Sequence, residues 1–172
     1  MFRSKRRPPL HVHDVGTLPM RVMPVDLDLL GHVNNGVYLS LMDLGRWDLL
    51  VRSGVAASFK EHGYYPVVAS ETISFRKSLQ PWQKFELQSR IIGYDLKACF
   101  VEQRFVVDGE IFAQGFIRAR FLKRSGGVVS MAELSEAVGV DVAGFHPPEW
   151  LTSWGAQVAL PPTRAEAPNV WN

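Results

Sequence analysis

The protein has 172 residues, 47% of them hydrophobic and 21% charged, with one cysteine and a formal net charge of +2. This composition excludes a largely disordered chain, an internal disulfide framework and a paired-cysteine zinc or redox site, and it indicates one globular domain in a reducing, cytoplasmic compartment. No window approaches about 18 consecutive apolar residues, so we expect no transmembrane segment, and so small a net charge gives no indication of a nucleic-acid partner.

Residues 1–16 are predicted to form a basic, flexible N-terminal arm. Its first seven positions hold four basic residues and no acid: Arg3, Lys5, Arg6 and Arg7. The other 15 basic residues and 17 acidic residues leave the rest of the chain at −2. The arm is either a solvated terminus or a weak contact for anionic lipid, RNA or CoA phosphates, and no apolar signal-peptide core follows it.

Residues 17–140 are predicted to form the folded domain. It opens with an interrupted edge strand from Leu18 to Val25, because the two prolines in this segment cannot donate to a ladder. A polar loop from Asp26 to Asn35 follows the strand.

A long helix is predicted from Gly36 to Ser53, where apolar residues recur every three or four positions. Few charges interrupt it, so most of its circumference is apolar, as expected of a largely enclosed helix. Asn34 or Asn35 can cap its first turn. Gly45 lies in the apolar stripe and allows another segment to approach closely.

After a linker, the apolar pattern changes to the period of a β-strand. Four such segments follow: Val67–Leu79, Phe85–Ile92, Ala98–Val107 and Glu110–Leu122. The connections are too short for crossover helices, so the last three strands form an antiparallel meander, and Asp108-Gly109 predicts a tight hairpin. The fold class is therefore α+β, with one long helix against a five- or six-stranded antiparallel sheet. Its exposed edge favours self-association.

The C-terminal part contains a short helix and a tail. Ser130 and Glu133 have capping-box spacing at the start of a helix from about Met131 to Val138. Residues 141–172 are rich in proline and tryptophan. We expect them to form an irregular tail that packs on the domain or on a partner.

The loop before the long helix concentrates the groups that can carry chemistry. Asp28 and His32 are four residues apart, close enough to serve one small cavity, and they precede a helix N-terminus whose N–H groups can stabilise an oxyanion. The alternative is that these residues only cap turns. His11 and His13 could bind a metal ion together, but no third ligand is apparent. The sequence also contains no GxSxG, HExxH, P-loop or GxGxxG motif, so we expect no metal and no cofactor.

One family resemblance joins this loop to the helix and the strands. The string Asp28-x-x-Gly31-His32-Val33-Asn34-Asn35-x-x-Tyr38, with Asp43 and Arg46 after it, resembles the signature of hot-dog-fold thioesterases of the 4-hydroxybenzoyl-CoA and acyl-CoA type. Ile73-Ser74-Phe75-Arg76 and Gly115-Phe116-Ile117-Arg118 also resemble that family. The likeness runs from about Leu18 to Lys123. It implies a helix wrapped by a sheet, in homodimers or dimers of dimers with continuous sheets and a site between subunits.

The resemblance also implies an activity, the hydrolysis of acyl-CoA in lipid metabolism, and a role for each motif residue. Asp28 would be the nucleophile or the general base, His32 would position water, and the backbone N–H of Asn35 would polarise the thioester carbonyl. The implied substrate-binding residues are Asn34, Gly36, Tyr38, Asp43 and Arg76. Coenzyme A would enter only as part of the substrate.

Two other functions stay open. Leu30 stands where acyl-carrier-protein thioesterases have asparagine, and Asp43 stands where many relatives have glutamate, so a non-catalytic acyl-CoA or lipid carrier is the first alternative. A hot-dog dehydratase is the second, although its loop usually spaces Asp and His five apart. Asp43 and Tyr38 also have ordinary structural explanations, as an ion-pair partner of Arg46 and as a core aromatic residue.

Overall fold

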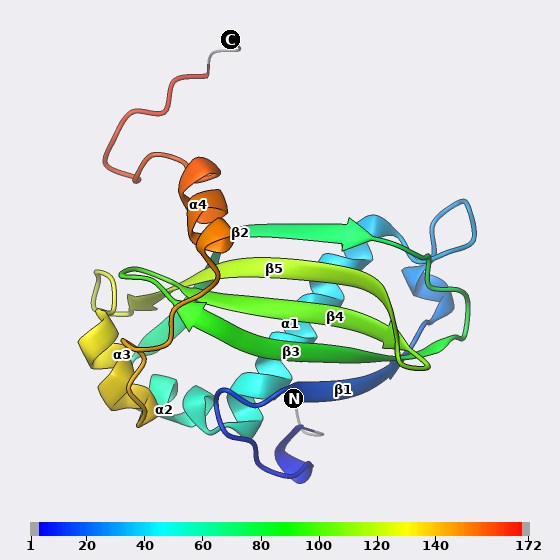
Figure 1. Ribbon diagram of the computed structural model, residues 1–172, viewed down its shortest axis with the longest axis horizontal. Coiled ribbons are helices and arrows are strands. Elements are labelled where there is room, and N and C mark those ends of the chain that lie inside the picture. The colour runs from blue at the N-terminus through cyan, green and yellow to red at the C-terminus, as the bar shows by residue number, and fades with distance from the viewer. Residues whose placement is uncertain (1–3, 170–172) are drawn as a thin grey trace.

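A five-stranded antiparallel sheet wrapped around one long helix forms the body of the protein (Figure 1). The computed structural model describes residues 4–169; the extreme ends of the predicted arm and tail, 1–3 and 170–172, lie outside the described residues. The strands are β1 (Gly16–Arg21), β2 (Tyr64–Phe75), β3 (Lys84–Tyr94), β4 (Cys99–Val107) and β5 (Glu110–Lys123). Their order is β1-β3-β4-β5-β2, which leaves β2 at one edge. The predicted α+β class and meander are confirmed.

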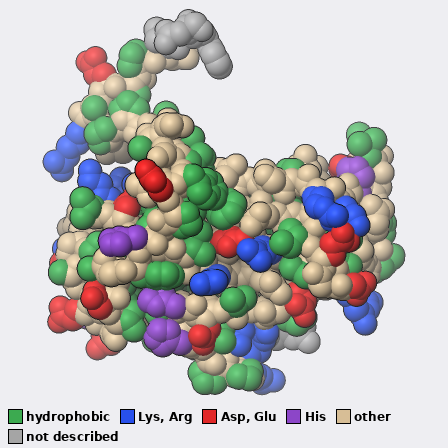
Figure 2. Space-filling model, viewed as in Figure 1, with side chains coloured by type: hydrophobic (Ala, Val, Ile, Leu, Met, Phe, Trp, Pro, Cys, Tyr) green, Lys and Arg blue, Asp and Glu red, His purple; other side chains and the backbone are tan. Residues whose placement is uncertain are grey.

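Helices lie on both sides of this sheet. They are α1 (Asn35–Arg52), α2 (Val55–His62), α3 (Met131–Val138) and α4 (Glu149–Gln157), with two 3-10 turns, η1 (Ser4–Arg6) and η2 (Pro24–Asp26). The long helix α1 covers the inner face, and α4 lies over one end of the opposite, outer face (Figure 1). On that outer face basic and acidic side chains are intermingled (Figure 2).

Helix α1 crosses the inner face of the sheet diagonally. Its first turn is near the end of β2, where the rings of Tyr38 and Phe75 lie 5.0 Å apart, and its last turns reach β1, where Leu49 lies against Gly16. Midway, a Cβ at Gly45 would be 2.7–2.8 Å from side-chain atoms of Ser89, Gln103 and Leu87. As predicted, α1 is therefore approached closely at Gly45. The groups that approach it are side chains of the sheet.

The strand boundaries and turns differ from prediction in specific places. The first strand ends at Arg21, and Pro24 starts the 3-10 turn η2, because proline suits the first position of a helical turn. The edge strand β2 starts at Tyr64 and ends at Phe75, so it begins and ends earlier than the predicted Val67–Leu79. The Asp108-Gly109 hairpin is confirmed, with φ of 49° and 81° at its two central residues.

Two helices were not predicted. The linker after α1 contains α2, which begins after Gly54 and ends before Gly63, both in the left-handed conformation. Within the predicted irregular tail, α4 packs on the outer face, where Trp150 contacts Phe116 at 4.8 Å between ring centroids. The part of the tail that forms α4 therefore packs on the domain, whereas residues 158–169 are exposed. Both helices are short and depend on tertiary contacts: Phe59 of α2 packs on Phe121, and Leu151 of α4 is fully buried.

The described part of the basic arm is packed against α1, although the sequence suggested a loose lead-in. Arg7 and Arg52 both contact the buried carboxylate of Asp48, at 2.9 and 3.1 Å. The backbone N–H of Leu10 donates to the carbonyl of Arg52. The positive charge of Arg7 is thus paired with the carboxylate of Asp48 inside the fold.

Candidate functional site

The loop between η2 and α1 is a tight hairpin that leads directly into the helix. Leu27 and Val33 form an antiparallel bridge, the N–H of Asp28 donates to the carbonyl of His32, and the N–H of Asn34 donates to the carbonyl of Asp26. Val33 points into the core and is 2% exposed. Because side chains alternate along paired strands, Asp28 and His32 face away from the core on the same side of the hairpin.

The structure brings the two predicted catalytic side chains together. Nδ1 of His32 lies 3.4 Å from Oδ2 of Asp28, and both side chains are half-buried, 31% and 24% exposed. The other carboxylate oxygen, Oδ1, accepts a hydrogen bond of 2.8 Å from the N–H of Leu30. One oxygen therefore holds the turn, and the other faces the imidazole. An ionised carboxylate in this position can accept a proton from water or attack a carbonyl carbon.

The start of α1 is set by Asn34. Its side-chain oxygen accepts a 2.8 Å hydrogen bond from the N–H of Gly36, which confirms the cap. The N–H of Asn35 finds no acceptor in the described part of the chain. The first turn of a helix carries partial positive charge as well as free N–H groups. Asn35 is thus left as the donor that could bind an oxyanion, whereas the Gly36 N–H is already used.

Tyr38 is a core residue and does not face solvent or a cavity. It is 1% exposed, its ring packs between Phe75 and Phe105, and its hydroxyl accepts a 3.2 Å hydrogen bond from the N–H of Leu79. Burial raises the pKa of this phenol. Since the carbonyl of Leu79 also accepts from the N–H of Val33, Tyr38 and Leu79 together fix the loop before α1 to the segment that connects β2 with β3.

A polar network under α1 was not predicted. The guanidinium of Arg46 contacts Asp43 on the same helix and donates a 2.8 Å hydrogen bond to Oε1 of Gln103. Gln103 is fully buried, and its amide nitrogen donates to the carbonyl of Met42 and the hydroxyl of Ser89. Asp43 thus has the expected pairing with Arg46. In the sequence, only Gly45 pointed to this region: it predicted a close approach to the helix, and its missing side chain leaves the space that Ser89 and Gln103 occupy.

Arg76 directly follows the end of β2. Its guanidinium lies 2.7 Å from Glu110, which also binds Lys77 at 2.6 Å. The two cations lower the pKa of the Glu110 carboxyl. Arg76 is more than half exposed, so it remains accessible to an anionic group despite this pairing.

Clusters of metal-ligating side chains and helices that could cross a membrane would mark two other kinds of functional site in residues 4–169. No group of three or more potential metal ligands occurs within this range. None of its helices combines the length and the apolar character that crossing a bilayer requires.

Comparison with protein families gives a match over most of the chain. Residues 22–159 match the family model described as the thioesterase-like superfamily. Protein THEM6 of Xenopus laevis is 39% identical over 99 residues, covering 58% of this chain and 48% of that protein. The chain spans about half the length of this protein and of the THEM6 protein of Danio rerio, two of the curated relatives that it matches.

Solved structures of thioesterases share the fold. The crystal structure of YbaW, a probable thioesterase from Escherichia coli, superposes with a TM-score of 0.67 at 22% identity, covering 73% of this chain and 98% of that one. The gentisyl-coenzyme A thioesterase BH1999 superposes with a TM-score of 0.63 at 19% identity, covering 72% and 99%. At these identities the likeness concerns the fold, and it confirms the predicted hot-dog architecture.

Proposed function

The chain belongs to the thioesterase-like superfamily, and from this premise we propose that it hydrolyses acyl-CoA thioesters to the free acid and CoA. The observation that carries the proposal is the pairing of Asp28 and His32, 3.4 Å apart, on the hairpin that leads into the N-terminus of α1. Thioester hydrolysis needs a nucleophile or general base and donors that stabilise the oxyanion, which the carboxylate and the free helix N–H groups can supply, and the imidazole can hold the attacking water.

In the proposed reaction, water or Asp28 attacks the thioester carbonyl. Oδ2 of Asp28 either removes a proton from the attacking water or forms an anhydride that water then hydrolyses. The negative charge on the carbonyl oxygen is stabilised by the N–H of Asn35 and the positive end of α1. The C–S bond breaks, the thiolate of CoA leaves, and it takes up a proton. His32 holds the carboxylate and the water in place, and no cofactor is needed for these steps.

We also propose that the protein works as a homodimer, with a dimer of dimers as the larger alternative. The outer edge of β2 is unpaired among residues 4–169, and Trp47 and Val68 beside it are about half exposed. An unpaired strand edge next to apolar side chains favours pairing with a second copy.

Release of free thiol from a panel of acyl-CoA substrates tests the activity. We expect turnover by the wild-type protein and a loss of at least about 10²-fold in kcat for Asp28→Asn, because a general base typically contributes that much. Asp141→Asn is the matched control, since Oδ1 of Asp141 accepts from the N–H two residues ahead, as Asp28 does. No turnover on any substrate, or full activity of Asp28→Asn, would contradict the proposal. Tight acyl-CoA binding without turnover would instead support the non-catalytic carrier.

A further inference from the structure

The connection between β2 and β3 holds an exposed tryptophan in a backbone conformation that bulky residues avoid. The N–H of Gln83 donates to the carbonyl of Gln80 at 3.1 Å and closes a turn with Pro81 and Trp82 at its centre. Trp82 has a φ of 63°, at a turn position where glycine is the usual residue. Its side chain is 56% exposed, so packing in the core does not explain why a tryptophan is found there. Strained positions of this kind are concentrated at binding and catalytic sites.

Two cations lie beside this turn. Arg21 and Lys84 are directly opposite each other in the pairing of β1 with β3, and both are exposed. The N–H of Val22 donates to the carbonyl of Gln83 at 3.0 Å, so the pairing continues from these cations towards Trp82. Within residues 4–169 no ion pair joins Arg21 or Lys84 to another side chain. Both positive charges are therefore available to an anion from solution.

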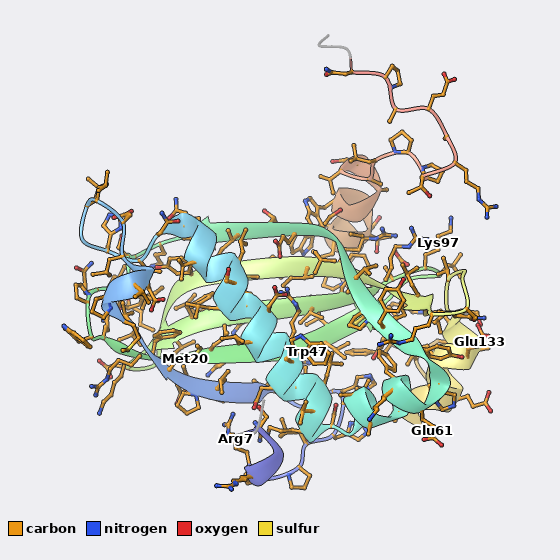
Figure 3. The ribbon with its side chains drawn as sticks, turned by 180° about the vertical axis from the view of Figure 1, so that it is seen from behind. Arg7, Met20, Trp47, Glu61, Lys97 and Glu133 are labelled. Carbon is orange, nitrogen blue, oxygen red and sulfur yellow. The ribbon has the colours of Figure 1, made fainter. Side chains whose placement is uncertain are left out.

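A broad groove of about 980 Å³ adjoins the two cations. Arg21 and Lys84 line it, together with Met20, which is labelled in Figure 3. Its volume is within the range of sites that hold small molecules and cofactors. The groove also contains two acids, Glu86 and Asp108. Phosphate groups would therefore be bound at Arg21 and Lys84, the charged residues that the strand pairing places next to the turn.

An exposed aromatic ring beside unpaired cations can recognise a nucleotide. A base stacks on an aromatic side chain, and arginine and lysine bind phosphate oxygens. The CoA part of the proposed substrate ends in an adenosine that carries phosphates on both sides of its ribose. Trp82, Arg21 and Lys84 thus offer the groups that this end of CoA requires.

This nucleotide site would be within reach of the catalytic loop. The β2–β3 connection and the loop before α1 lie at the same end of the sheet (Figure 1). The N–H of Val33 donates to the carbonyl of Leu79 at 3.1 Å, and Leu79 precedes Trp82 by three residues. The Cα atoms of Val33 and Trp82 are therefore at most about 18 Å apart. The arm of CoA between its sulfur and its diphosphate has about thirteen bonds, the length of about four extended residues or about 14 Å, and the ribose and base extend it further.

We propose that Trp82, Arg21 and Lys84 form the subsite for the phosphorylated adenosine of CoA, with the base stacked on Trp82 and the phosphates at the two cations. The inference rests on the proposed function and adds the identity of the thiol carrier to it. The phosphopantetheine arm of an acyl-carrier protein has no adenosine, so this subsite favours acyl-CoA over acyl-carrier-protein substrates.

A truncated substrate tests the subsite. We expect Trp82→Gly to raise KM for an acyl-CoA about tenfold, the size of one lost base stack, with little change in kcat. The same acyl group on N-acetylcysteamine, which lacks the nucleotide, should give unchanged kcat and KM. Trp150→Ala is the matched control, because Trp150 is 51% exposed and lies on α4. Equal KM effects on the two substrates, or no effect on either, would overturn the subsite.

Stability separates a binding role of Trp82 from a structural one. Glycine adopts positive φ without strain, so Trp82→Gly should be at least as stable as wild type in urea denaturation. A residue retained for the fold would instead lose stability when it is replaced. A clearly destabilised Trp82→Gly would therefore contradict the role proposed for this side chain.

The cations are tested separately. We expect Arg21→Gln and Lys84→Gln each to raise KM for acyl-CoA about threefold, as for exposed ion pairs, and to leave N-acetylcysteamine thioesters unaffected. Arg124→Gln is the matched control, because Arg124 is exposed and follows the opposite end of the sheet, after β5. An equal rise of KM in Arg124→Gln would show that only the overall charge matters, and it would overturn the phosphate contacts.

Binding of adenosine 3′,5′-bisphosphate, measured by calorimetry, distinguishes this inference from the proposed function. We expect the wild-type protein to bind it and Trp82→Gly to bind it about tenfold more weakly. If wild type binds this nucleotide but hydrolyses no acyl-CoA, the subsite is supported and the proposed function is contradicted. If wild type hydrolyses acyl-CoA but does not bind the nucleotide, the subsite is overturned and the proposed function is unaffected.

Discussion

Asp28 and His32 face each other across the hairpin before α1, with Oδ2 of the aspartate 3.4 Å from Nδ1 of the histidine. The backbone of the same two residues is joined by a 2.9 Å hydrogen bond from the Asp28 N–H to the His32 carbonyl. The loop therefore fixes both the backbone and the side chains of Asp28 and His32. In the proposed reaction, His32 would therefore act through Asp28, because its imidazole lies next to the Asp28 carboxylate and has no other partner among the described residues.

Replacement of His32 should reduce kcat less than replacement of Asp28. For His32→Ala we expect a loss of up to about 10²-fold in kcat with little change in KM, because a misplaced catalytic group costs that much. His32→Gln, which can still hydrogen-bond to Asp28, should recover part of the loss. Steady-state thiol release measures both, and His62→Gln, at a surface site bonded to Ser58, is the control. Full activity in His32→Ala would exclude this role.

The cap at Asn34 connects stability to activity. We expect Asn34→Ala to lower the free energy of unfolding by about 1 kcal/mol, since it removes the acceptor for the Gly36 N–H. The first turn of α1 should then fray, and kcat should fall as the Asn35 N–H loses its position.

Ser130→Ala is the matched control for this cap. Ser130 caps α3 through the N–H of Glu133, so its loss should cost similar stability and leave kcat unchanged. Urea denaturation and thiol-release kinetics on both variants give the comparison. Equal losses of kcat would show that only global stability is affected.

The elements that the sequence predicted well are those determined by neighbouring residues. Asp108-Gly109, the Ser130 and Glu133 capping box and the cap at Asn34 each depend on residues within three positions of one another. The pairing of Asp28 and His32 was predictable for the same reason, since one tight loop contains both.

What the sequence did not predict depends on strand register and on distant segments. Gln103 reaches Arg46 only because β4 places it directly under Gly45. Arg7 reaches Asp48 across 41 positions of the chain. The apolar cavity beside α1, which is lined by residues of β2, β3, β4 and β5, also depends on strand register, which no local pattern contains.

Gly45→Ala tests the close approach between α1 and the sheet. The added Cβ would lie 2.7–2.8 Å from Ser89, Gln103 and Leu87, so at least one of these side chains must move. We expect a loss of about 1–3 kcal/mol in the free energy of unfolding, as for other overpacked cores. Ser40→Ala, on the exposed face of the same helix, should be close to neutral. Chemical denaturation distinguishes the two, and equal stability of Gly45→Ala and wild type would contradict the packing described.

Glu133 should make stability depend on pH in the acid range. The hydrogen bond from Lys123, followed by those from the N–H and hydroxyl of Ser130, lowers the pKa of its carboxyl from 4.5 to about 2. A carboxyl whose pKa is lower in the folded state stabilises the fold above its ordinary pKa, and this contribution is lost as the pH falls towards the folded value. We therefore expect Glu133→Gln to be less stable than wild type at pH 6, with the difference shrinking between pH 4.5 and pH 2. Urea denaturation at several pH values measures it, and because the pair is exposed to solvent, added salt should also reduce the difference. A difference that grows on acidification would show that the Lys123 and Ser130 contacts do not stabilise the ionised carboxylate.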